Sequence, residues 1–577
     1  MKELNICRRP EPPQDLPVFN QVNPVLARIY ATRGVHDLDD LGRNLKALLP
    51  DAGLKGIEDA VARLVKAIQQ QDKILIVGDF DCDGATSTAV ALLALRRMGF
   101  HSVDYLVPNR FDYGYGLSAE IVDVARERQP QLLITVDNGI SSLSGVQRAA
   151  EYGIDVLVTD HHLPGSELPE ACAIVNPNQP ACSFPAKSTC GVGVIFYVMI
   201  ALRRALQQIN WFAEQQIQAP NLAGLLDLVA LGTVADVVPL EQNNRILVHQ
   251  GLQRIRAGYA RPGILALLDV AGRQRHKLVA SDLGFAIAPR LNAAGRLEDI
   301  SIGIECLITD DAEQARKLAA TLDQLNKDRR GIEDEMQQHA VTLLDDLKIE
   351  SEAFPYGVCL YDESWHQGVI GILASRIKER MHRPVIAFAP GDEGEIKGSA
   401  RSISGFHVRD GLDAIAAENP GLLSKFGGHA MAAGMTLKAS DYQQFSEAFD
   451  REVRRQLSEA DLQETVLTDG GLLAAEISIE MAEMLREAGP WGHQFPEPLF
   501  DGEFALLQQR LVGQKHLKMV LMDHASGLAV DAIKFNADLE LWPNDSVARV
   551  RVVYRLDINE FRGQRSVQLI VDQLLPV

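Results

Sequence analysis

Residues 73–98, KILIVGDFDCDGATSTAVALLALRRM, carry the pattern from which the fold of this chain follows. The β-favouring residues Ile74–Val77 predict a buried strand that ends at Gly78. After Gly84, an apolar run predicts a helix over residues 85–98. Between strand and helix, three aspartates stand at alternate positions: Asp79, Asp81 and Asp83. Alternate side chains of an extended turn point the same way, so we expect three carboxylates just beyond the carboxyl end of a strand, where open α/β sheets bind ligands.

Three neighbouring carboxylates repel one another unless a cation holds them together. Their oxygen atoms are hard ligands, which suit Mg²⁺ or Mn²⁺. The alternative is a solvated acidic turn, because aspartate is also a common turn residue. Further potential ligands elsewhere in the sequence are needed to decide between a metal site and a solvated turn.

The length and composition indicate a globular protein of several domains. A chain of 577 residues corresponds to three or four domains of about 150 residues each. Its hydrophobic content of 46% and charged content of 23% are ordinary for a soluble protein. No apolar run approaches the ~18 residues of a membrane span, and the N-terminal residues lack the apolar core of a signal peptide. We therefore expect a cytoplasmic protein without membrane contact.

The charged and cysteine residues exclude several classes. The seven cysteines form no CxxC pair, so neither a disulfide framework nor a zinc ribbon is indicated. The net charge of −20 argues against a surface that is basic throughout. A local basic groove for nucleic acid stays possible, because the field of a cleft depends on the charges that line it.

Strands and helices alternate between residues 51 and 240. Such alternation predicts βαβ units and a parallel sheet. The predicted strands are Ile74–Val77, Val103–Val107, Leu132–Val136, Val156–Thr159 and Ile174–Val175. The predicted helices are 85–98, 119–128, 143–152 and 195–208.

Potential metal ligands follow three further apolar runs. Asp137 ends the run in LLITVDNG, and the tripeptide Asp160-His161-His162 ends VLVTDHH. Asp236 follows the run in LLDLVALGTVADVV. Because parallel strands end at one edge of a sheet, these side chains can converge with the first three aspartates. Several Asp with one or two His fit a pair of Mn²⁺ or Mg²⁺ ions better than zinc. Two such ions, ~3.5–4 Å apart, activate water and clamp a phosphoryl group.

The four runs together resemble a known family. DFDCDG, VDNG, TDHH and GTVAD, in this order, are similar to the four motifs of the DHH phosphoesterase superfamily. The resemblance implies a catalytic set of metal ligands at Asp81, Asp83, Asp137, His161 and Asp236. Asp79 stands near a position where other branches carry histidine, and we expect it to be a further ligand. The resemblance places Asp160 and His162 behind the ligands or facing the phosphate.

Other residues are candidates for phosphate contact. Arg110 lies in PNRFDYGYG, where Tyr113 and Tyr115 either stack on a base or order the loop. Arg290 and Asn292 lie in PRLNAAGR, and the resemblance supports Arg290.

A second α/β unit is predicted after a long charged helix over residues 311–347. Its runs GSARS and FGGHAMAAG resemble the DHH-associated domain, which holds substrate opposite the catalytic domain. Glycines let backbone amides approach an anion. The resemblance implies that Ser399, Arg401 and His429 bind phosphate.

The C-terminal region predicts successive strands without helices, which is typical of a small OB-like barrel. Five of its residues either touch a nucleic-acid backbone or are ordinary surface residues: Lys515, His516, Lys518, Lys534 and Arg565.

The fold prediction is thus a parallel-sheet catalytic domain, a connecting helix, a second α/β domain and a β-barrel. The predicted boundaries are 1–50 for an N-terminal covering segment, 51–240 catalytic, 241–350 helical, 351–455 DHH-associated and 456–577 OB-like.

This arrangement resembles the single-strand-specific 5′→3′ exonucleases of the superfamily. The resemblance implies hydrolysis of single-stranded DNA in repair and recombination by a monomer, with a single-strand-binding protein and a helicase as partners. The polarity comes from resemblance alone. Two alternatives stay open: a phosphodiesterase of short oligonucleotides or cyclic dinucleotides, and a non-catalytic scaffold that binds single strands. A scaffold of this kind would be expected to have lost ligands, whereas all of them are present here.

Overall fold

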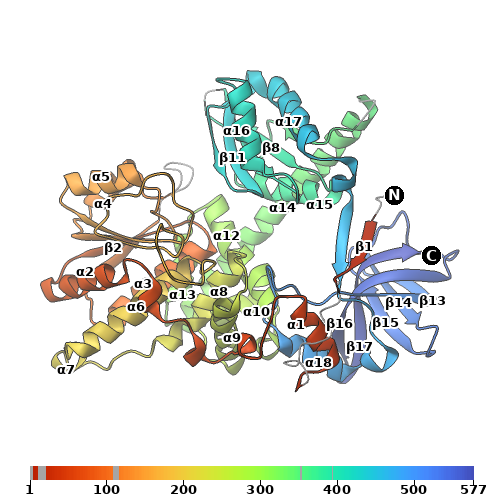
Figure 1. The fold of residues 1–577 in the computed structure, drawn as a ribbon, viewed down its shortest axis with the longest axis horizontal. Helices are drawn as coiled ribbons and strands as arrows, with labels where there is room; N and C mark the ends of the chain where they lie inside the picture. Colours follow the sequence, from red (N-terminus) through yellow and green to blue (C-terminus); the bar gives the residue numbers. More distant parts are fainter. Residues whose placement is uncertain (1–3, 11–20, 108–115, 351–353, 393) are drawn as a thin grey trace. The chain divides into compact units, whose positions relative to one another are not determined.

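The computed structural model describes residues 4–10, 21–107, 116–350, 354–392 and 394–577 (Figure 1). The chain forms two compact units. The larger unit comprises residues 8–323 and 467–577, and the smaller comprises residues 324–466 with the N-terminal residues up to Cys7. We describe each unit by itself.

A five-stranded parallel sheet organises the first part of the larger unit. Its strands, in the order β3-β2-β4-β5-β6, are Val103–Leu106, Ile74–Gly78, Leu132–Val136, Asp155–Thr159 and Ala173–Val175. The central strands β2 and β4 are buried along their whole length, as expected from their predominantly apolar sequences. Helices cover both faces: α4 (Ala119–Arg126) and α5 (Leu143–Glu151) on one, and α2 (Ile57–Gln70), α3 (Cys82–Arg97) and α6 (Gly191–Gln208) on the other (Figure 1). The predicted parallel α/β fold is confirmed.

The turn after β2 differs from the prediction of an extended segment. Helix α3 begins at Cys82, and the side chain of Asp81 caps it by accepting a hydrogen bond from the Gly84 amide at 3.0 Å. Asp83 therefore lies in the first helical turn. Aspartate is among the best N-cap residues, and this preference outweighs the extended alternation that we expected. Gly84 is required here, because an added Cβ would lie 2.4 Å from the carbonyl oxygen of Asp79.

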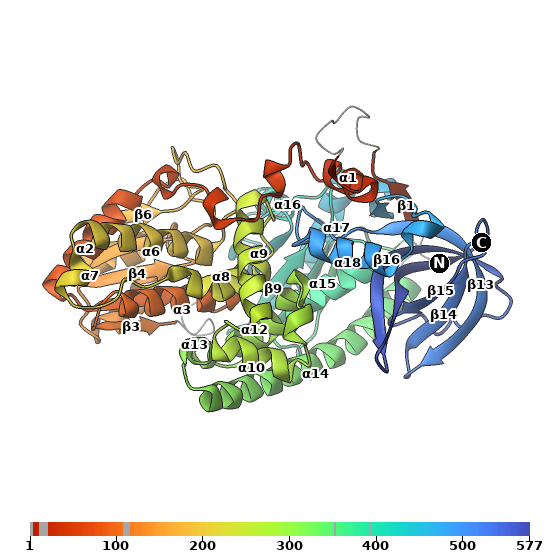
Figure 2. The ribbon, with the colours of Figure 1, turned by 90° about the horizontal axis from the view of Figure 1, so that it is seen from below.

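Asp236 follows a helix and does not follow a strand. The apolar run before it forms α8 (Leu226–Ala235), which is buried over most of its length and packs on α3, α6 and α9 (Gln242–Ala257) (Figure 2). A continuous apolar run suits a buried helix and a buried strand equally well, so the sequence alone could not decide between them.

A helical region continues the larger unit. Its helices are α10 (Pro262–Val270), α11 (Ala280–Asp282), a π-helical turn Leu283–Ile287, α12 (Ala288–Leu297) and α13 (Ser301–Ile308). The predicted long helix is α14 (Ala312–Glu350), which runs from the larger unit into the smaller one.

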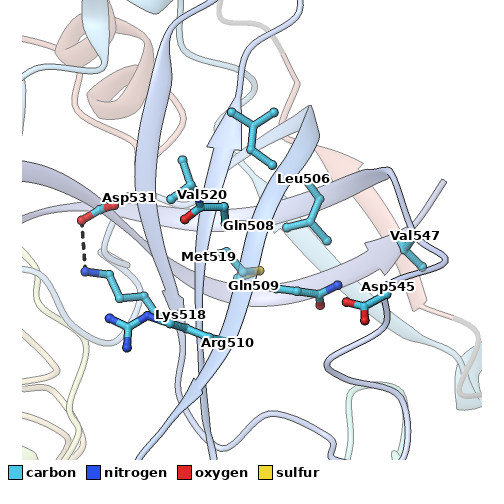
Figure 3. A pocket seen from close by; sticks show the side chains of 11 residues that line it. Leu506, Gln508, Gln509, Arg510, Lys518, Met519, Val520, Asp531, Asp545 and Val547 are labelled. Atoms are coloured by element: carbon cyan, nitrogen blue, oxygen red, sulfur yellow. Dashed lines mark ion pairs between the residues drawn. The ribbon is translucent and has the colours of Figure 1, made fainter.

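The C-terminal strands form a closed barrel in the order β13-β14-β15-β17-β16. Their bounds are Phe500–Val512, His516–Met522, Ala529–Lys534, Gln564–Pro576 and Arg549–Phe561. With the five strands numbered in chain order, their order around the barrel is 1-2-3-5-4, and the predicted OB-like barrel is confirmed. A bulge between Leu506 and Gln508 accompanies a hollow of about 550 Å³ on this sheet, where Lys518 pairs with Asp531 at 3.2 Å (Figure 3).

The acidic stretch before the barrel has its own structure. It contains β12 (Glu464–Thr468), which pairs with β1 (Leu4–Arg8), and α18 (Ile479–Ala488), which packs on β16. The barrel strands themselves begin at Phe500.

The N-terminal segment that we predicted as a cover packs on the loop before the barrel. Tyr30, in α1 (Pro24–Ala31), stacks on Trp491 and Phe495, and its hydroxyl donates to the carbonyl oxygen of Ala488 at 3.0 Å. Phe495 is buried between Trp491 and the guanidinium of Arg245 in α9, which lies 4.3 Å from the ring centroid. This aromatic cluster joins the N-terminal segment, the helical region and the loop before the barrel.

The smaller unit holds a second sheet, of order β10-β11-β9-β8-β7. Its strands are Lys425–Gly428, Ala432–Lys438, Glu395–Arg401, Val385–Pro390 and Val358–Tyr361. Its helices are α15 (Ile370–Met381), α16 (Val408–Glu418) and α17 (Tyr442–Gln456). Two apolar clusters pack against the two faces of this sheet, which confirms the second α/β domain.

Candidate metal centre

The end of β4 and the end of β5 bring a carboxylate and an imidazole together. The Oδ1 atom of Asp137 lies 3.1 Å from Nε2 of His161, and Oδ2 of Asp236 lies 3.5 Å from the same nitrogen. Asp137 has φ +62°, in the left-handed region that aspartate tolerates better than most residues. Two residues on, Gly139 has φ +114°, and a Cβ there would lie 2.4 Å from the Thr135 hydroxyl oxygen. The tight turn directs Asp137 towards His161.

Asp83 is held by the N-terminus of a second helix. Its two carboxylate oxygens accept hydrogen bonds from the amides of Gly191 and Val192 at 2.7 and 2.9 Å, at the start of α6. A Cβ on Gly191 would lie 2.6 Å from Oδ1 of Asp137, and one on Gly232 would lie 2.8 Å from Oδ1 of Asp83. These two glycines were not among the predicted site residues, although the GVG run that begins at Gly191 is a sequence signal of close approach.

All six predicted ligands belong to one cluster. Three overlapping groups have ligand atoms within 4.8 Å of one another: Asp137, His161 and His162; Asp83, His161 and Asp236; Asp79, Asp81 and Asp137. Carboxylate oxygens dominate the donor set, and imidazole supplies the rest. This chemistry fits Mn²⁺ or Mg²⁺, with donors enough for two ions. The ligand role of each residue stays a prediction.

Without a cation, the carboxylates of the cluster repel one another and resist ionisation. Burial and the neighbouring Asp81 raise the pKa of Asp83 to about 7. Burial and the surrounding carboxylates also raise the pKa values of Asp137 and Asp236 well above the usual range. A divalent cation would reverse these shifts, because it favours the ionised form of each carboxylate.

Asp160 and His162 contact each other beside the predicted ligands. Oδ1 of Asp160 lies 2.7 Å from Nδ1 of His162 and also accepts from the amide of His161, while Oδ2 accepts from Ile140. Burial opposes the charge on His162, but Asp160 prevails and raises its pKa to about 9. Burial likewise opposes ionisation of Asp160, yet the bond to His162 brings its pKa below the usual value. Asp160 thus fixes the orientation of the His162 imidazole beside the cluster.

We expect Asp160→Asn to weaken Mn²⁺ binding about 10–100-fold, as changes behind metal ligands typically do. The asparagine side chain keeps the shape but loses the negative charge that binds the His162 ring and three backbone amides, those of Ile140, His161 and His162. Isothermal titration calorimetry with Mn²⁺ measures the effect. Asp155→Asn, at the opposite and exposed end of β5, is the matched control. Equal affinities of the two variants would contradict the assigned role of Asp160.

The phosphate candidates have different surroundings. Arg110 lies outside the described residues. Arg290 is buried, and its guanidinium pairs with Asp323 at 2.7 Å and donates to the carbonyl oxygen of Ala286. Asn292 accepts from the amide of Cys82 at 2.8 Å and so supports the turn that carries the first aspartates. Both residues are therefore occupied by contacts that maintain the fold, and phosphate contact stays a prediction for them.

The candidates of the smaller unit lie on its sheet. Arg401, in β9, donates to the hydroxyl of Ser399 at 3.1 Å, and burial lowers its pKa. Strand β9 pairs with β11, so that Arg401 lies opposite Ala432 and Ser399 opposite Gly434 in the sheet. Strand β11 follows the turn that contains His429. Gly371 lies close to this pair, because an added Cβ there would lie 2.9 Å from the Arg401 guanidinium and 3.0 Å from the Ser399 hydroxyl oxygen.

The barrel cations are engaged in part. Lys518 pairs with Asp531, Arg565 pairs with Glu483, and Lys534 donates to the carbonyl oxygen of Asp572. These contacts favour the interpretation of these three as ordinary surface residues.

Comparison with known proteins agrees with this architecture. Residues 73–233 match the DHH family N-terminal domain, residues 354–455 the DHHA1 domain, and residues 468–573 the RecJ OB domain. The single-stranded-DNA-specific exonuclease RecJ of Escherichia coli K12 is 54% identical over 577 residues, which covers all of both chains. The chain belongs to the RecJ family. The RecJ protein of Thermus thermophilus is 34% identical over 92% of this chain and 72% of its own length.

Solved RecJ structures share the fold. The crystal structure of Thermus thermophilus RecJ in complex with Mn²⁺ has a TM-score of 0.81 and 30% identity, and covers 99% of this chain and 79% of that one. The complex of the same protein with Mg²⁺ has a TM-score of 0.74 and 28% identity, over 100% and 79% of the two chains. The metals in these RecJ structures are those that the donor set of this chain suits. Among the described residues, no helix is both long and apolar enough to cross a membrane.

Proposed function

We propose that this chain is a metal-dependent exonuclease that degrades single-stranded DNA from the 5′ end by phosphodiester hydrolysis. The observation that supports it best is the buried cluster of aspartates and histidines at the carboxyl edge of a parallel sheet. The cluster is complete in a chain that matches RecJ exonucleases from end to end. A complete donor set also argues against a non-catalytic scaffold.

The residues of the cluster would bind the metal ions and orient the phosphate of the substrate. Asp81, Asp83, Asp137, His161 and Asp236 would hold the ions, with Asp79 beside them. When bound, Mn²⁺ or Mg²⁺ supplies an activated water and stabilises the charge of the phosphoryl oxygens. His162, whose positive charge Asp160 favours, would donate a hydrogen bond from a ring N–H to a phosphate oxygen. Asp83 keeps its orientation through two backbone amides that no side-chain movement can withdraw.

The wider role follows from the family. We infer that the enzyme acts in DNA repair and recombination in the cytoplasm, as a monomer, with a single-strand-binding protein and a helicase as partners. The OB barrel supports single-strand binding, because such barrels bind oligonucleotides. Ser399, Arg401 and His429 of the DHHA1 domain are proposed to bind backbone phosphate.

The test is degradation of a long single-stranded DNA that is blocked at one end or the other. We expect loss with Mn²⁺ or Mg²⁺, none with EDTA, and arrest by a 5′ block but not by a 3′ block. Gel electrophoresis of end-labelled strands measures all three. Arrest by the 3′ block, and not by the 5′ block, would show that degradation starts at the 3′ end. Hydrolysis of dinucleotides without loss of the long strand would instead indicate the small-substrate phosphodiesterase, and binding without hydrolysis would indicate the scaffold.

A further inference from the structure

A groove of about 1260 Å³ lies between the C-terminal end of α8 and the barrel, within the larger unit. One wall is formed by the end of α8 and the helical region, and the other by α18, the following loop and strands of the barrel. Val237, which directly follows the predicted ligand Asp236, lines the groove and is exposed. The groove therefore begins beside the backbone segment that carries the predicted ligand Asp236.

Two exposed phenylalanines line this groove from opposite walls. Phe285, on the π-helical turn, has 79% of its surface exposed, and Phe535, directly after β15, has 50%. The turn of Phe285 is anchored on α8, because a Cβ on the adjacent Gly284 would lie 3.2 Å from Val234. Phe535 packs edge-on against His516, with ring centroids 5.2 Å apart. Each ring is thus held by its own wall and presents a face to the groove.

The charges of the groove are balanced by pairs among the described residues. Four of its cations contact carboxylates that also line it: Arg273 with Asp282, Arg486 with Asp557, Arg555 with Glu497, and Lys277 with Glu560. A surface of paired charges and exposed rings is poorly suited to phosphates. It suits flat, uncharged groups such as nucleobases.

We propose that Phe285 and Phe535 stack on bases of the single strand as it passes from the barrel to the metal centre. This inference rests on the proposed function and assigns it two contact residues. The occupant is a nucleic acid because the groove lies between the segment that carries the predicted ligand Asp236 and a barrel of a type that binds oligonucleotides. Bases of any sequence have a π-face, so stacking also agrees with an enzyme that has to accept every sequence.

The test measures binding without cleavage. In EDTA, fluorescence anisotropy of a labelled oligothymidylate of about 15 nucleotides gives the dissociation constant. We expect Phe285→Ala to weaken binding about 5- to 100-fold, the usual effect of losing one stacked base, and Phe285→Trp to retain it. Phe535→Ala should have an effect of similar size. Tyr259→Ala is the matched control, because Tyr259 is an aromatic residue of the helical region, 72% exposed, that does not line the groove.

Two further readouts separate stacking from a general loss of structure. An oligonucleotide of the same length with abasic sites throughout should bind wild type and Phe285→Ala equally. The slope of log affinity against log salt should also be the same for both proteins, because no phosphate contact is removed. An equal loss on the abasic strand, or no loss on either strand, would overturn the inference. Metal-dependent cleavage by the wild type is measured in parallel, so a failure of the proposed function is distinguished from a failure of this inference.

Discussion

Replacing Asp137 with Asn is expected to reduce metal-dependent cleavage of single-stranded DNA by about a thousandfold or more, which corresponds to the several kcal/mol that a bound metal contributes to such a reaction. Asp137 lies at the centre of the cluster, in two of the three ligand groups. Asparagine tolerates the left-handed backbone at φ +62°, so the turn should keep its shape. A steady-state cleavage assay with Mn²⁺ measures the loss, and DNA binding in EDTA should be unchanged.

The same variant has a second, independent signature in its thermal stability. Burial and the nearby Asp83 and Asp81 raise the pKa of Asp137. A carboxyl group whose pKa is raised on folding lowers the stability of the folded protein above its unfolded-state pKa; the loss grows as the pH rises and levels off above the folded-state pKa. At neutral pH, Asp137→Asn should therefore raise the melting temperature of the metal-free protein and reduce the further increase caused by Mn²⁺.

Asp123→Asn is the matched control for both measurements. Asp123 is exposed, and it pairs with Arg148 at 2.9 Å on the surface, away from the cluster. The control should cut normally and show the full stabilisation by Mn²⁺. Normal cleavage by Asp137→Asn would show that the ligand assignment is wrong.

Asp469→Ala is expected to destabilise the larger unit by about 3–5 kcal/mol, the usual cost of removing one partner of a buried ion pair. Asp469 and Arg33 are each 1% exposed and form two contacts, at 2.7 and 3.0 Å. Asp469 also accepts from the amide of Leu499 at 3.1 Å. The alanine variant would leave the Arg33 guanidinium buried without its carboxylate. Chemical denaturation followed by tryptophan fluorescence reports the change, since Trp491 lies beside Arg33.

A comparison of pairs tests the cause of this loss. Glu503→Ala removes an exposed partner of Arg549 on the barrel and should cost less than about 1 kcal/mol. The double variant Arg33→Met with Asp469→Leu should recover most of the lost stability, because the fully buried Arg33 charge is removed together with its partner, while Arg9, 3.7 Å from Asp469, is 22% exposed. A double variant as unstable as Asp469→Ala would indicate that the site needs its hydrogen bonds and not merely charge balance.

Local sequence patterns were sufficient to predict the α/β class, the order of the domains and the set of candidate ligands. Strands such as Leu132–Val136 are short and mostly apolar, and each is followed by polar residues. The hydrophobic pattern and the ends of such strands can therefore be recognised from the local sequence. The OB-like barrel could likewise be predicted, because alternating strands separated by turns need no distant information. The aspartates were found because they follow these runs directly.

How the ligands are held depends on the packing of distant segments. Asp83 owes its orientation to amides 108 and 109 residues away in the chain, and Asp236 ends a helix that the sequence could not distinguish from a strand. The buried pair of Arg33 and Asp469 and the groove of Phe285 and Phe535 also join distant segments. A local pattern records which face of an element is apolar. Which segments then meet depends on the packing of all elements at once, and no single stretch of sequence contains that information.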